Sequence, residues 1–269
     1  MRNEDMNIYD RFRLDGKIAV VTGGSKGIGR GIALAFADCG ADVVIIARGQ
    51  KDSESVVKEI EARGQKSIAI SADVMDLESI PKALDKVCNE MGRLDIMVNN
   101  AGGNLDRKMH ALPEISVEKF DEQLTLNMKT KWWGSQQAAE RMTDGGRIIN
   151  IISVAAHRAS PGFGVYSAAN LGMISMTRTL AVELANKKIT VNCIAPGIIL
   201  TDMLKETLNI DDQETHSMFD STIPLGRVGK PEDCAAAAIF FASPAAEWIS
   251  GQYIDVSGGP EGFSLSKET

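Results

Sequence analysis

The stretch YSAAN places a tyrosine, Tyr166, four positions before an asparagine, Asn170, within a segment of small and apolar residues. Residues four apart lie on one face of a helix, so the phenol and the amide are predicted to share a side. A phenol held in this way can give or take a proton, and a neighbouring cation would favour its phenolate form. Asn170 is neutral, so the cation is missing from the position where it would be expected.

A glycine-rich stretch, VVTGGSKGIGRG, is the second feature with chemical potential, because Gly23, Gly27 and Gly29 lie between an apolar run and an amphipathic one. Glycines let a backbone turn tightly and approach a pyrophosphate, and the helix that follows offers free N–H groups and the positive end of its dipole. This strand–turn–helix context is the one that a dinucleotide site requires. The stretch lacks Gly-Lys-Ser/Thr at P-loop spacing, which excludes that alternative.

The end of the second apolar run distinguishes the two nicotinamide cofactors. A site for NAD usually has an acidic residue about 20 residues beyond the glycines, bonded to the ribose 2′-hydroxyl. The sequence VVIIARGQ has Arg48 there instead, and a guanidinium can hold a 2′-phosphate through two hydrogen bonds. Lys26 adds a second cation, so we predict NADP(H) rather than NAD(H). The alternative is that Arg48 is only a solvated surface residue.

Short apolar runs alternate with amphipathic stretches along the chain, which predicts an α/β fold. Several runs are apolar almost throughout, as is typical of strands buried on both faces. Right-handed crossovers then give a doubly wound Rossmann fold, with a seven-stranded, mostly parallel sheet and helices on both faces of a single domain. The expected strands are 17–22, 42–47, 67–71, 94–100, 146–152, 189–194 and 252–256, and the expected helices are 27–39, 53–63, 76–91, 116–142, 164–186 and 231–242.

The predicted domain spans residues 14–260, between an N-terminal extension at 1–13 and a tail at 261–269. Two stretches, 102–115 and 198–225, fit the alternation poorly. Stretches of this kind beside the carboxyl ends of strands commonly form the wall or lid of a site. We expect the second of them to contain a substrate lid.

Composition limits the classes of partner. The 269 residues are 44% hydrophobic, enough for a full core, and the net charge of −7 with a pI near 5.1 argues against nucleic acid. The four cysteines and three histidines are scattered without ligand spacing, so we expect reduced cysteines and no metal site. The charged N-terminus does not resemble a signal peptide, and no apolar run has the length of a membrane span, which predicts a soluble cytoplasmic protein.

With these motifs the chain resembles the short-chain dehydrogenase/reductase family from about Leu14 to Gly259. A serine, Ser153, precedes Tyr166 by 13 residues, which is the family's usual offset. The other matching segments, in chain order, are TGGSKGIG at 22–29, NNAG at 99–102, LNMK at 126–129, GRIINIISVAA at 146–156, PGIILTDM at 196–203 and the C-terminal stretch at 226–259.

The resemblance implies an oxidoreductase that moves a hydride between NADP(H) and a small-molecule carbonyl or secondary alcohol. It implies that Ser153 hydrogen-bonds the substrate oxygen, that Tyr166 gives or takes the proton, and that Asn127 anchors a water chain. The implied cofactor-binding set, from the glycine loop to the residues that flank the adenine, line the ribose and hold the carboxamide and pyrophosphate, is Gly23, Ser25, Lys26, Gly27, Ile28, Gly29, Arg48, Asp73, Val74, Asn100, Ala101, Gly102, Tyr166, Pro196, Gly197, Ile199 and Thr201.

Asn170 departs from the family pattern, which has a lysine four residues after the tyrosine. That lysine lowers the tyrosine pKa and bonds the nicotinamide ribose, and Asn170 can do only the second. An isolated tyrosine has a pKa near 10, and a nearby cation moves such a pKa by about 1–3 units. Without it, Tyr166 is expected to stay protonated at neutral pH, so that oxidation suffers more than reduction.

Three explanations are compatible with Asn170. In the first, the enzyme works with this residue, slowly or with another cation such as Lys131, four residues after Asn127 and so on the same helix face. In the second, the chain is a disabled variant whose lysine was exchanged for Asn170. In the third, it is a cofactor-binding protein without turnover that serves as a sensor or an assembly subunit. The otherwise complete site pattern favours the first two.

Small residues in the helix expected from 164, among them Ser167, Ala168, Ala169 and Gly172, would allow another helix to approach closely. The resemblance implies that this helix and the preceding one pair across a two-fold axis, which predicts a homotetramer, with a dimer as the second choice. The alternative is that these residues pack within their own chain. Polyols, steroids, β-ketoacyl groups and simple ketones all stay open as substrates.

Overall fold

The computed structural model describes residues 7–105, 108–143, 145–202, 204 and 220–259. The start of the predicted N-terminal extension, much of the predicted lid and the whole predicted C-terminal tail therefore lie outside the described residues. No helix within the described ranges has both the length and the apolar character needed to cross a membrane.

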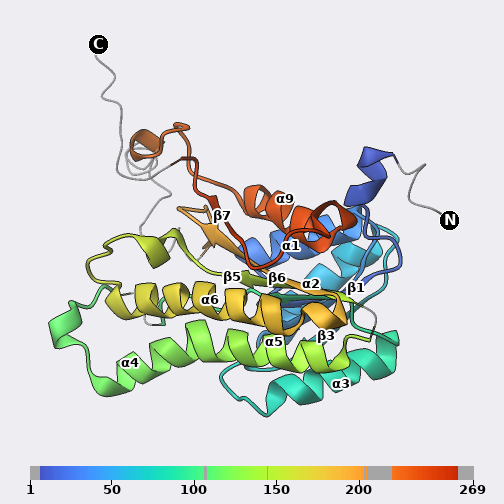
Figure 1. The fold of residues 1–269 in the computed structure, drawn as a ribbon, viewed down its shortest axis with the longest axis horizontal. Helices are drawn as coiled ribbons and strands as arrows, with labels where there is room; N and C mark the ends of the chain where they lie inside the picture. The colour runs from blue at the N-terminus through green and yellow to red at the C-terminus, as the bar shows by residue number, and fades with distance from the viewer. Residues whose placement is uncertain (1–6, 106–107, 144, 203, 205–219, 260–269) are drawn as a thin grey trace.

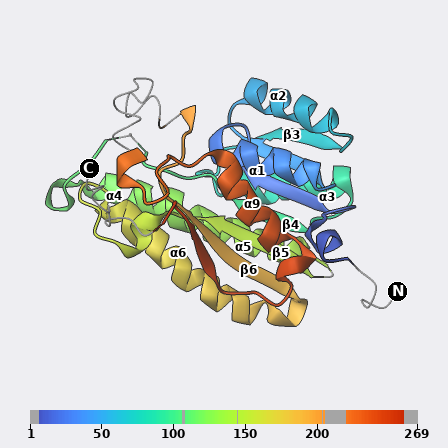
Figure 2. The same cartoon turned by 90° about the horizontal axis from the view of Figure 1, so that it is seen from above.

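Seven strands form one sheet in the order β3-β2-β1-β4-β5-β6-β7, and every neighbouring pair is parallel, which confirms the predicted doubly wound fold (Figures 1 and 2). The order in which the chain adds its strands reverses between β1 and β4, because β2 and β3 lie on one side of β1 and β4 to β7 lie on the other. In such folds ligands bind in the crevice outside the carboxyl ends of the strands at this reversal. The strands are β1 (Ile18–Thr22), β2 (Asp42–Ala47), β3 (Ser67–Ser71), β4 (Ile96–Asn99), β5 (Gly146–Ile151), β6 (Ile189–Pro196) and β7 (Tyr253–Val256).

Helices cover both faces of the sheet, because every crossover between parallel strands has the same hand. One face is covered by α1 (Gly27–Asp38), α2 (Gln50–Glu61) and α9 (Pro231–Ala242), and the other by α3 (Ser79–Met91), α4 (Val117–Leu124), α5 (Thr130–Arg141) and α6 (Gly164–Glu183) (Figure 2). Short 3-10 helices lie in the connections, at Ile8–Phe12, Leu112–Glu114, Val154–His157, Ala185–Lys187 and Pro244–Ala246.

The apolar strands divide their side chains between two cores. In β1, Ala19 and Val21 pack with α1 and α9, whereas Ile18 and Val20 pack with α3 and α5. A strand between two helical layers needs apolar residues at successive positions, which explains why the runs lack a polar–apolar alternation.

One predicted element was wrong in detail, because the single helix expected at 116–142 is two helices joined by a π turn at Thr125–Lys129. This turn contains Asn127 and packs against α6. A Cβ placed on Gly172 of α6 would lie 2.7 Å from the sulfur of Met128, so this glycine gives the π turn room to approach. At Gly172, packing within the chain therefore accounts for the small residue.

A row of buried polar side chains crosses the sheet beneath the crevice. The Asn99 amide nitrogen of β4 donates to Asn150 Oδ1 of β5 at 2.9 Å and to Ser135 Oγ of α5 at 3.0 Å. The Asn150 amide donates in turn to Thr177 Oγ1 of α6 at 3.0 Å, and the Thr177 hydroxyl contacts the Cys193 sulfur of β6 at 3.1 Å. These bonds replace the water that the groups lose on burial.

Candidate active site

The glycine loop between β1 and α1 forms a cradle at the reversal point of the sheet. Gly27 has a φ of +53°, which favours glycine, and a Cβ on it would lie 3.0 Å from Thr201 Cγ2. A Cβ on Gly29 would overlap the Gly23 carbonyl oxygen and lie 2.5 Å from Asn100 Nδ2. Side chains at these positions would fill or push open the space where the chain turns.

The first turn of α1 leaves its backbone N–H groups available to a ligand. Lys26 is the N-cap residue, and no side chain caps this 12-residue helix. Uncapped N–H groups and the helix dipole together favour an anion at this position. The cradle and the helix end therefore fit the pyrophosphate of a dinucleotide.

The loop after β4 is tied directly to the glycine loop. Thr22 Oγ1 accepts from the backbone N–H groups of Asn100 at 3.0 Å and Ala101 at 3.1 Å. The Asn100 amide donates to the carbonyl oxygens of Thr22 at 2.9 Å and Gly23 at 3.2 Å. These bonds bring the predicted Asn100–Gly102 segment to the floor of the crevice.

Asn127 holds the same loop from the helical side. Its Oδ1 accepts from the Gly103 N–H at 2.8 Å, and its Nδ2 donates to the Gly103 carbonyl at 3.0 Å and to the Gln123 carbonyl at 3.2 Å. The side chain is fully buried. Its amide therefore fixes the backbone that follows β4 relative to the π turn.

Ser153 and Tyr166 meet at the end of the crevice beside α6. Ser153 caps the 3-10 helix Val154–His157, with its Oγ accepting from the Ala155 N–H at 3.2 Å. Burial raises the pKa of the Tyr166 phenol, and polar contacts with Ser153 and Asn170 oppose that rise without cancelling it. The serine hydroxyl and the phenol are thus neighbours.

Asn170 is fully buried, and the nitrogen of its side-chain amide forms a hydrogen bond whereas, among the described residues, the oxygen does not. The Nδ2 group donates to the Tyr166 backbone carbonyl one turn earlier, at 2.7 Å, which limits what it can give to the phenol. The Oδ1 atom accepts no hydrogen bond from any described residue. A buried acceptor without a donor is destabilising by about 1–3 kcal/mol, so this atom has capacity for a hydroxyl of a bound ligand.

The two cations from which the sequence analysis predicts NADP(H), Arg48 and Lys26, are both exposed. Arg48 follows β2 with 82% of its side chain exposed, and its guanidinium is 3.9 Å from a carboxylate oxygen of Asp73. The Lys26 ammonium forms a 2.8 Å ion pair with Asp52. Both pairs are exposed and therefore weak, so both cations can turn toward a bound phosphate.

The remaining predicted cofactor residues flank these groups. The Gly197 N–H donates to the Val256 carbonyl at 2.9 Å and so continues the sheet beyond β6, and buried Ile199 forms a bridge to Gly229. Val74 lines a small cavity beneath Thr22 and Ala101. Three others, in the glycine loop, the first turn of α1 and the end of β6, are Ser25, Ile28 and Pro196.

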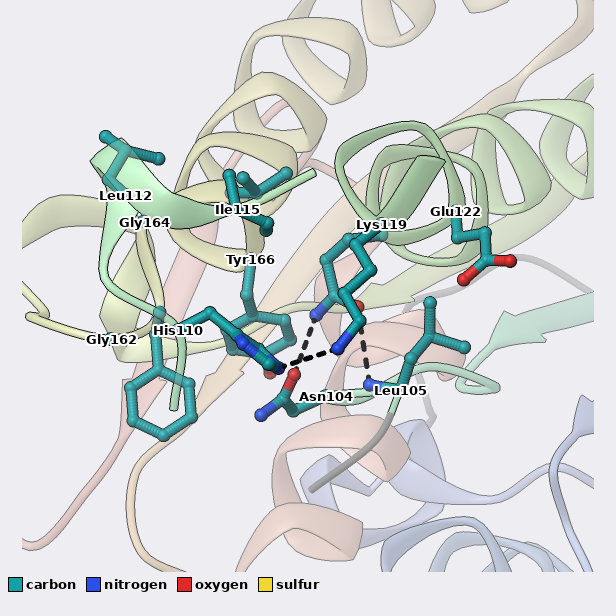
Figure 3. Close-up of a pocket in the computed structure, with 13 residues that line it drawn as sticks. Asn104, Leu105, His110, Leu112, Ile115, Lys119, Glu122, Gly162, Gly164 and Tyr166 are labelled. Carbon is teal, nitrogen blue, oxygen red and sulfur yellow. Dashed lines mark hydrogen bonds between the residues drawn. The ribbon is translucent and has the colours of Figure 1, made fainter. Parts of the chain in front are cut away.

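A pocket of about 60 Å³ opens beside Tyr166, and sequence reasoning identified only part of its wall (Figure 3). The predicted 102–115 stretch contributes His110, and α4 contributes Lys119, whose ammonium is 3.2 Å from His110 Nε2. No sequence signal marked Lys119, because its place in the wall depends on how α4 packs. The lining residues are Asn104, Leu105, His110, Leu112, Ile115, Lys119, Glu122, Gln123, Gly162, Phe163, Gly164, Val165 and Tyr166.

Known proteins are similar to this chain in both sequence and fold. A family model described as enoyl-(acyl carrier protein) reductase matches residues 23–261. Versicolorin reductase stcU of Emericella nidulans is 38% identical over 264 residues, covering 94% of this chain and 99% of that protein. The structure of 7α-hydroxysteroid dehydrogenase complexed with NADH and 7-oxo glycochenodeoxycholic acid has a TM-score of 0.88 and 35% identity, covering 96% of this chain and 100% of that chain.

A short-chain dehydrogenase from Burkholderia cenocepacia, solved in complex with NADP, is similarly related, with a TM-score of 0.84 and 36% identity, covering 92% of this chain and 98% of that chain. The chain therefore belongs to the short-chain dehydrogenase/reductase family, as its motifs predicted. It is an oxidoreductase of this family, and its solved relatives bind nicotinamide cofactors of both kinds.

Proposed function

We propose that the chain is an NADP(H)-dependent oxidoreductase that interconverts a small-molecule carbonyl and the corresponding secondary alcohol. The observation that carries the proposal is the contact between the Ser153 hydroxyl and the Tyr166 phenol at the end of a crevice that begins with a glycine cradle. A hydroxyl and a phenol side by side can bind one substrate oxygen and supply its proton.

Each residue then has one task in the reaction. The cofactor supplies the hydride. Ser153 donates a hydrogen bond to the substrate oxygen, and Tyr166 gives that oxygen its proton in reduction or removes it in oxidation. Asn127 holds the loop after β4 and anchors a water chain. Asn170, through its unused Oδ1, accepts from a ribose hydroxyl of the cofactor.

The cofactor-binding set predicted from the sequence is proposed to hold the dinucleotide along the carboxyl edge of the sheet. Gly23, Gly27 and Gly29 with the first turn of α1 receive the pyrophosphate, and Arg48 with Lys26 receives the 2′-phosphate. Asp73 and Val74 flank the adenine. The ribose and carboxamide contacts come from Asn100, Ala101, Gly102, Pro196, Gly197, Ile199 and Thr201.

The proposal is tested by following NADPH consumption with a panel of ketones, sugars, steroids and acyl thioesters, for the parent chain and for Asn170→Lys. We expect one substrate class to be reduced by the parent, and to be reduced faster by Asn170→Lys. If both proteins bind NADPH and neither reduces any member of the panel, the enzyme proposal is wrong for these substrates. The hypothesis that the chain is a cofactor-binding sensor or assembly subunit would then be favoured.

Arg48→Ala is expected to weaken NADPH binding by about 10- to 100-fold while NADH binding stays within about twofold. The reason is that a hydrogen bond to a charged group contributes about 1.5–3 kcal/mol, and only NADPH carries the 2′-phosphate. Titration of each cofactor by fluorescence measures the two affinities. Lys58→Ala, which removes an exposed cation of α2 outside the predicted cofactor set, is the control. Equal losses for both cofactors in Arg48→Ala would contradict a role for Arg48 in selecting NADP.

The assembly that we propose is a homotetramer, with a dimer as the second choice. Large apolar side chains are exposed along α4, α5 and α6; α4 and α5 run end to end, and both lie alongside α6 on one face of the molecule (Figure 1). An apolar surface of this kind suits a helical interface with a second copy. The side chains are Val117, Phe120, Trp132, Leu171 and Val182.

The proposed location is the cytoplasm. All four cysteines, Cys39, Cys88, Cys193 and Cys234, carry free thiols, and two of them are buried. Free, partly buried thiols fit a reducing compartment, where cysteines act as small apolar residues.

A further inference from the structure

Lys131 is the one lysine or arginine whose side chain is buried, among the residues that the structure describes. It lies in the first turn of α5 and is 3% exposed. No described carboxylate forms an ion pair with its ammonium, and the ionisable group nearest to it is the Cys193 thiol. Burial lowers its pKa to about 8. Burying a cation without a partner is costly, and such residues concentrate at functional sites.

The ammonium lies under the loop that follows β4. A Cβ placed on Gly102 would be 2.8 Å from Lys131 Nζ and 2.9 Å from Asn127 Oδ1, so both polar ends point to the same place. The rest of the side chain borders the small cavity beneath Ala101 and Thr22. Because β4 adjoins the reversal point of the sheet, the ammonium is at the floor of the crevice where the cofactor is proposed to bind.

The opposite wall of the crevice supplies no charge. Position 170 of α6 is a neutral asparagine with a buried, unpartnered oxygen, and the basic residue further along that helix, Arg178, is exposed. The π turn that precedes Lys131 packs against α6, so α5 and α6 approach the crevice together. A cation from one helix can therefore serve where the other has only an amide.

We propose that Lys131 is the active-site cation, reaching the crevice from α5 and replacing the charge that α6 lacks at Asn170. Its ammonium donates to the cofactor beside Gly102 and supplies the positive charge that position 170 of α6 does not. The inference rests on the proposed function for its catalytic part. Its binding part is open to test without any turnover.

The test is NADPH affinity as a function of pH in Lys131→Met, which keeps the length of the side chain and removes the charge. Lys129→Met is the matched control, since Lys129 is exposed and only two residues away. The parent is expected to lose about tenfold in affinity between pH 7 and pH 9, because an ammonium with a pKa of about 8 is charged below that pH and neutral above it. We expect Lys131→Met to bind about tenfold more weakly at pH 7 and to show no such slope.

Two other titratable groups near this region have pKa values above that range. The Cys193 thiol of β6, which faces the ammonium, has a pKa of about 11, and the pKa of Tyr166 is raised above its ordinary value. The pocket beside Tyr166 adds His110, Lys119 and Glu122, which Lys131→Met leaves in place, so any contribution of theirs to the slope persists in that variant. The slope can therefore be assigned to Lys131.

A variant that places a lysine on α6 distinguishes an effect of the Lys131 charge from a structural effect of replacing Lys131. The double variant Lys131→Met with Asn170→Lys is expected to recover most of the lost NADPH affinity and of any lost turnover, which a merely structural role for Lys131 would not allow. Lys131→Gln, neutral but polar, replaces Lys131→Met if the latter does not fold. Parent-like affinity and slope in the neutral variant, or an equal loss in Lys129→Met, would overturn the proposal. If no substrate is turned over by any of these proteins, the proposed reductase activity fails while the binding data still decide on Lys131.

Discussion

Replacing Tyr166 with phenylalanine is expected to lower the turnover number for carbonyl reduction by about 10²- to 10⁴-fold, the range that a positioned acid or base contributes. The aromatic ring should stay in place, because it packs edge-on against Phe163 with the ring centroids 6.5 Å apart. NADPH affinity should therefore stay within about threefold of the parent. Stopped-flow measurement of NADPH consumption separates the chemical step from binding.

The pH profile provides the control for this variant. Burial raises the pKa of Tyr166, so the phenol stays protonated through neutral pH and reduction is expected to be flat there. Oxidation needs the phenolate, so its rate should rise by about tenfold per pH unit until the pKa is reached. Tyr166→Phe should lose this rise. Parent-like rates with an unchanged pH profile in Tyr166→Phe would show that another group moves the proton.

Replacing Gly29 with alanine is expected to weaken NADPH binding by at least about 100-fold. The added methyl group would overlap the Gly23 carbonyl oxygen and press on the Asn100 amide at 2.5 Å. Neither neighbour is the free end of a flexible side chain, since one is backbone and the other is bonded to Thr22 and Gly23. The cradle must therefore open. Isothermal titration with NADPH measures the loss.

Gly49→Ala is the matched control for this change. Gly49 is the N-cap of α2 with a φ of −85°, and a Cβ on it would make only an ordinary contact, 3.4 Å from Asp52 Oδ2. Substituting alanine for glycine at an N-cap costs roughly 1 kcal/mol or less, so NADPH binding should be close to that of the parent. Tight NADPH binding by Gly29→Ala would show that the dinucleotide does not depend on the close approach of α1 to the glycine loop.

The strands and most helices could be predicted because their signals are local. Runs such as DVVIIA are apolar at successive positions, and the sheet needs this wherever helices cover both faces. The break in the helix expected at 116–142 could not be predicted in this way. Asn127 in the π turn bonds Gly103, a residue 24 positions earlier, so the interruption accompanies a tertiary contact.

In the candidate site, too, some features could be predicted from the sequence, and those that depend on tertiary contacts could not. Ser153 and Tyr166 could be paired because their 13-residue offset is the usual one in the family that the chain resembles. The contact of Lys119 with His110 depends on how a loop lies against α4, and no spacing encodes that approach. For Lys131, the helical period predicted a face shared with Asn127, and the structure places both polar ends near Gly102. Its burial could not be predicted, since a charged residue is ordinarily exposed.

The bonded amides of Asn99 and Asn150 also bear on how the chain avoids misfolding. The two residues are direct partners across β4 and β5, and the pairs that precede them, Met97 with Ile148 and Val98 with Ile149, are apolar residues that would tolerate other alignments. Slipping one strand by a single residue would turn its amide to the opposite face of the sheet, away from its partner and from water. Each buried amide left without a hydrogen-bond partner would destabilise the fold by about 1–3 kcal/mol. The Asn99–Asn150 pair therefore disfavours a shifted strand register, which the apolar contacts of the core alone would distinguish poorly from the native one.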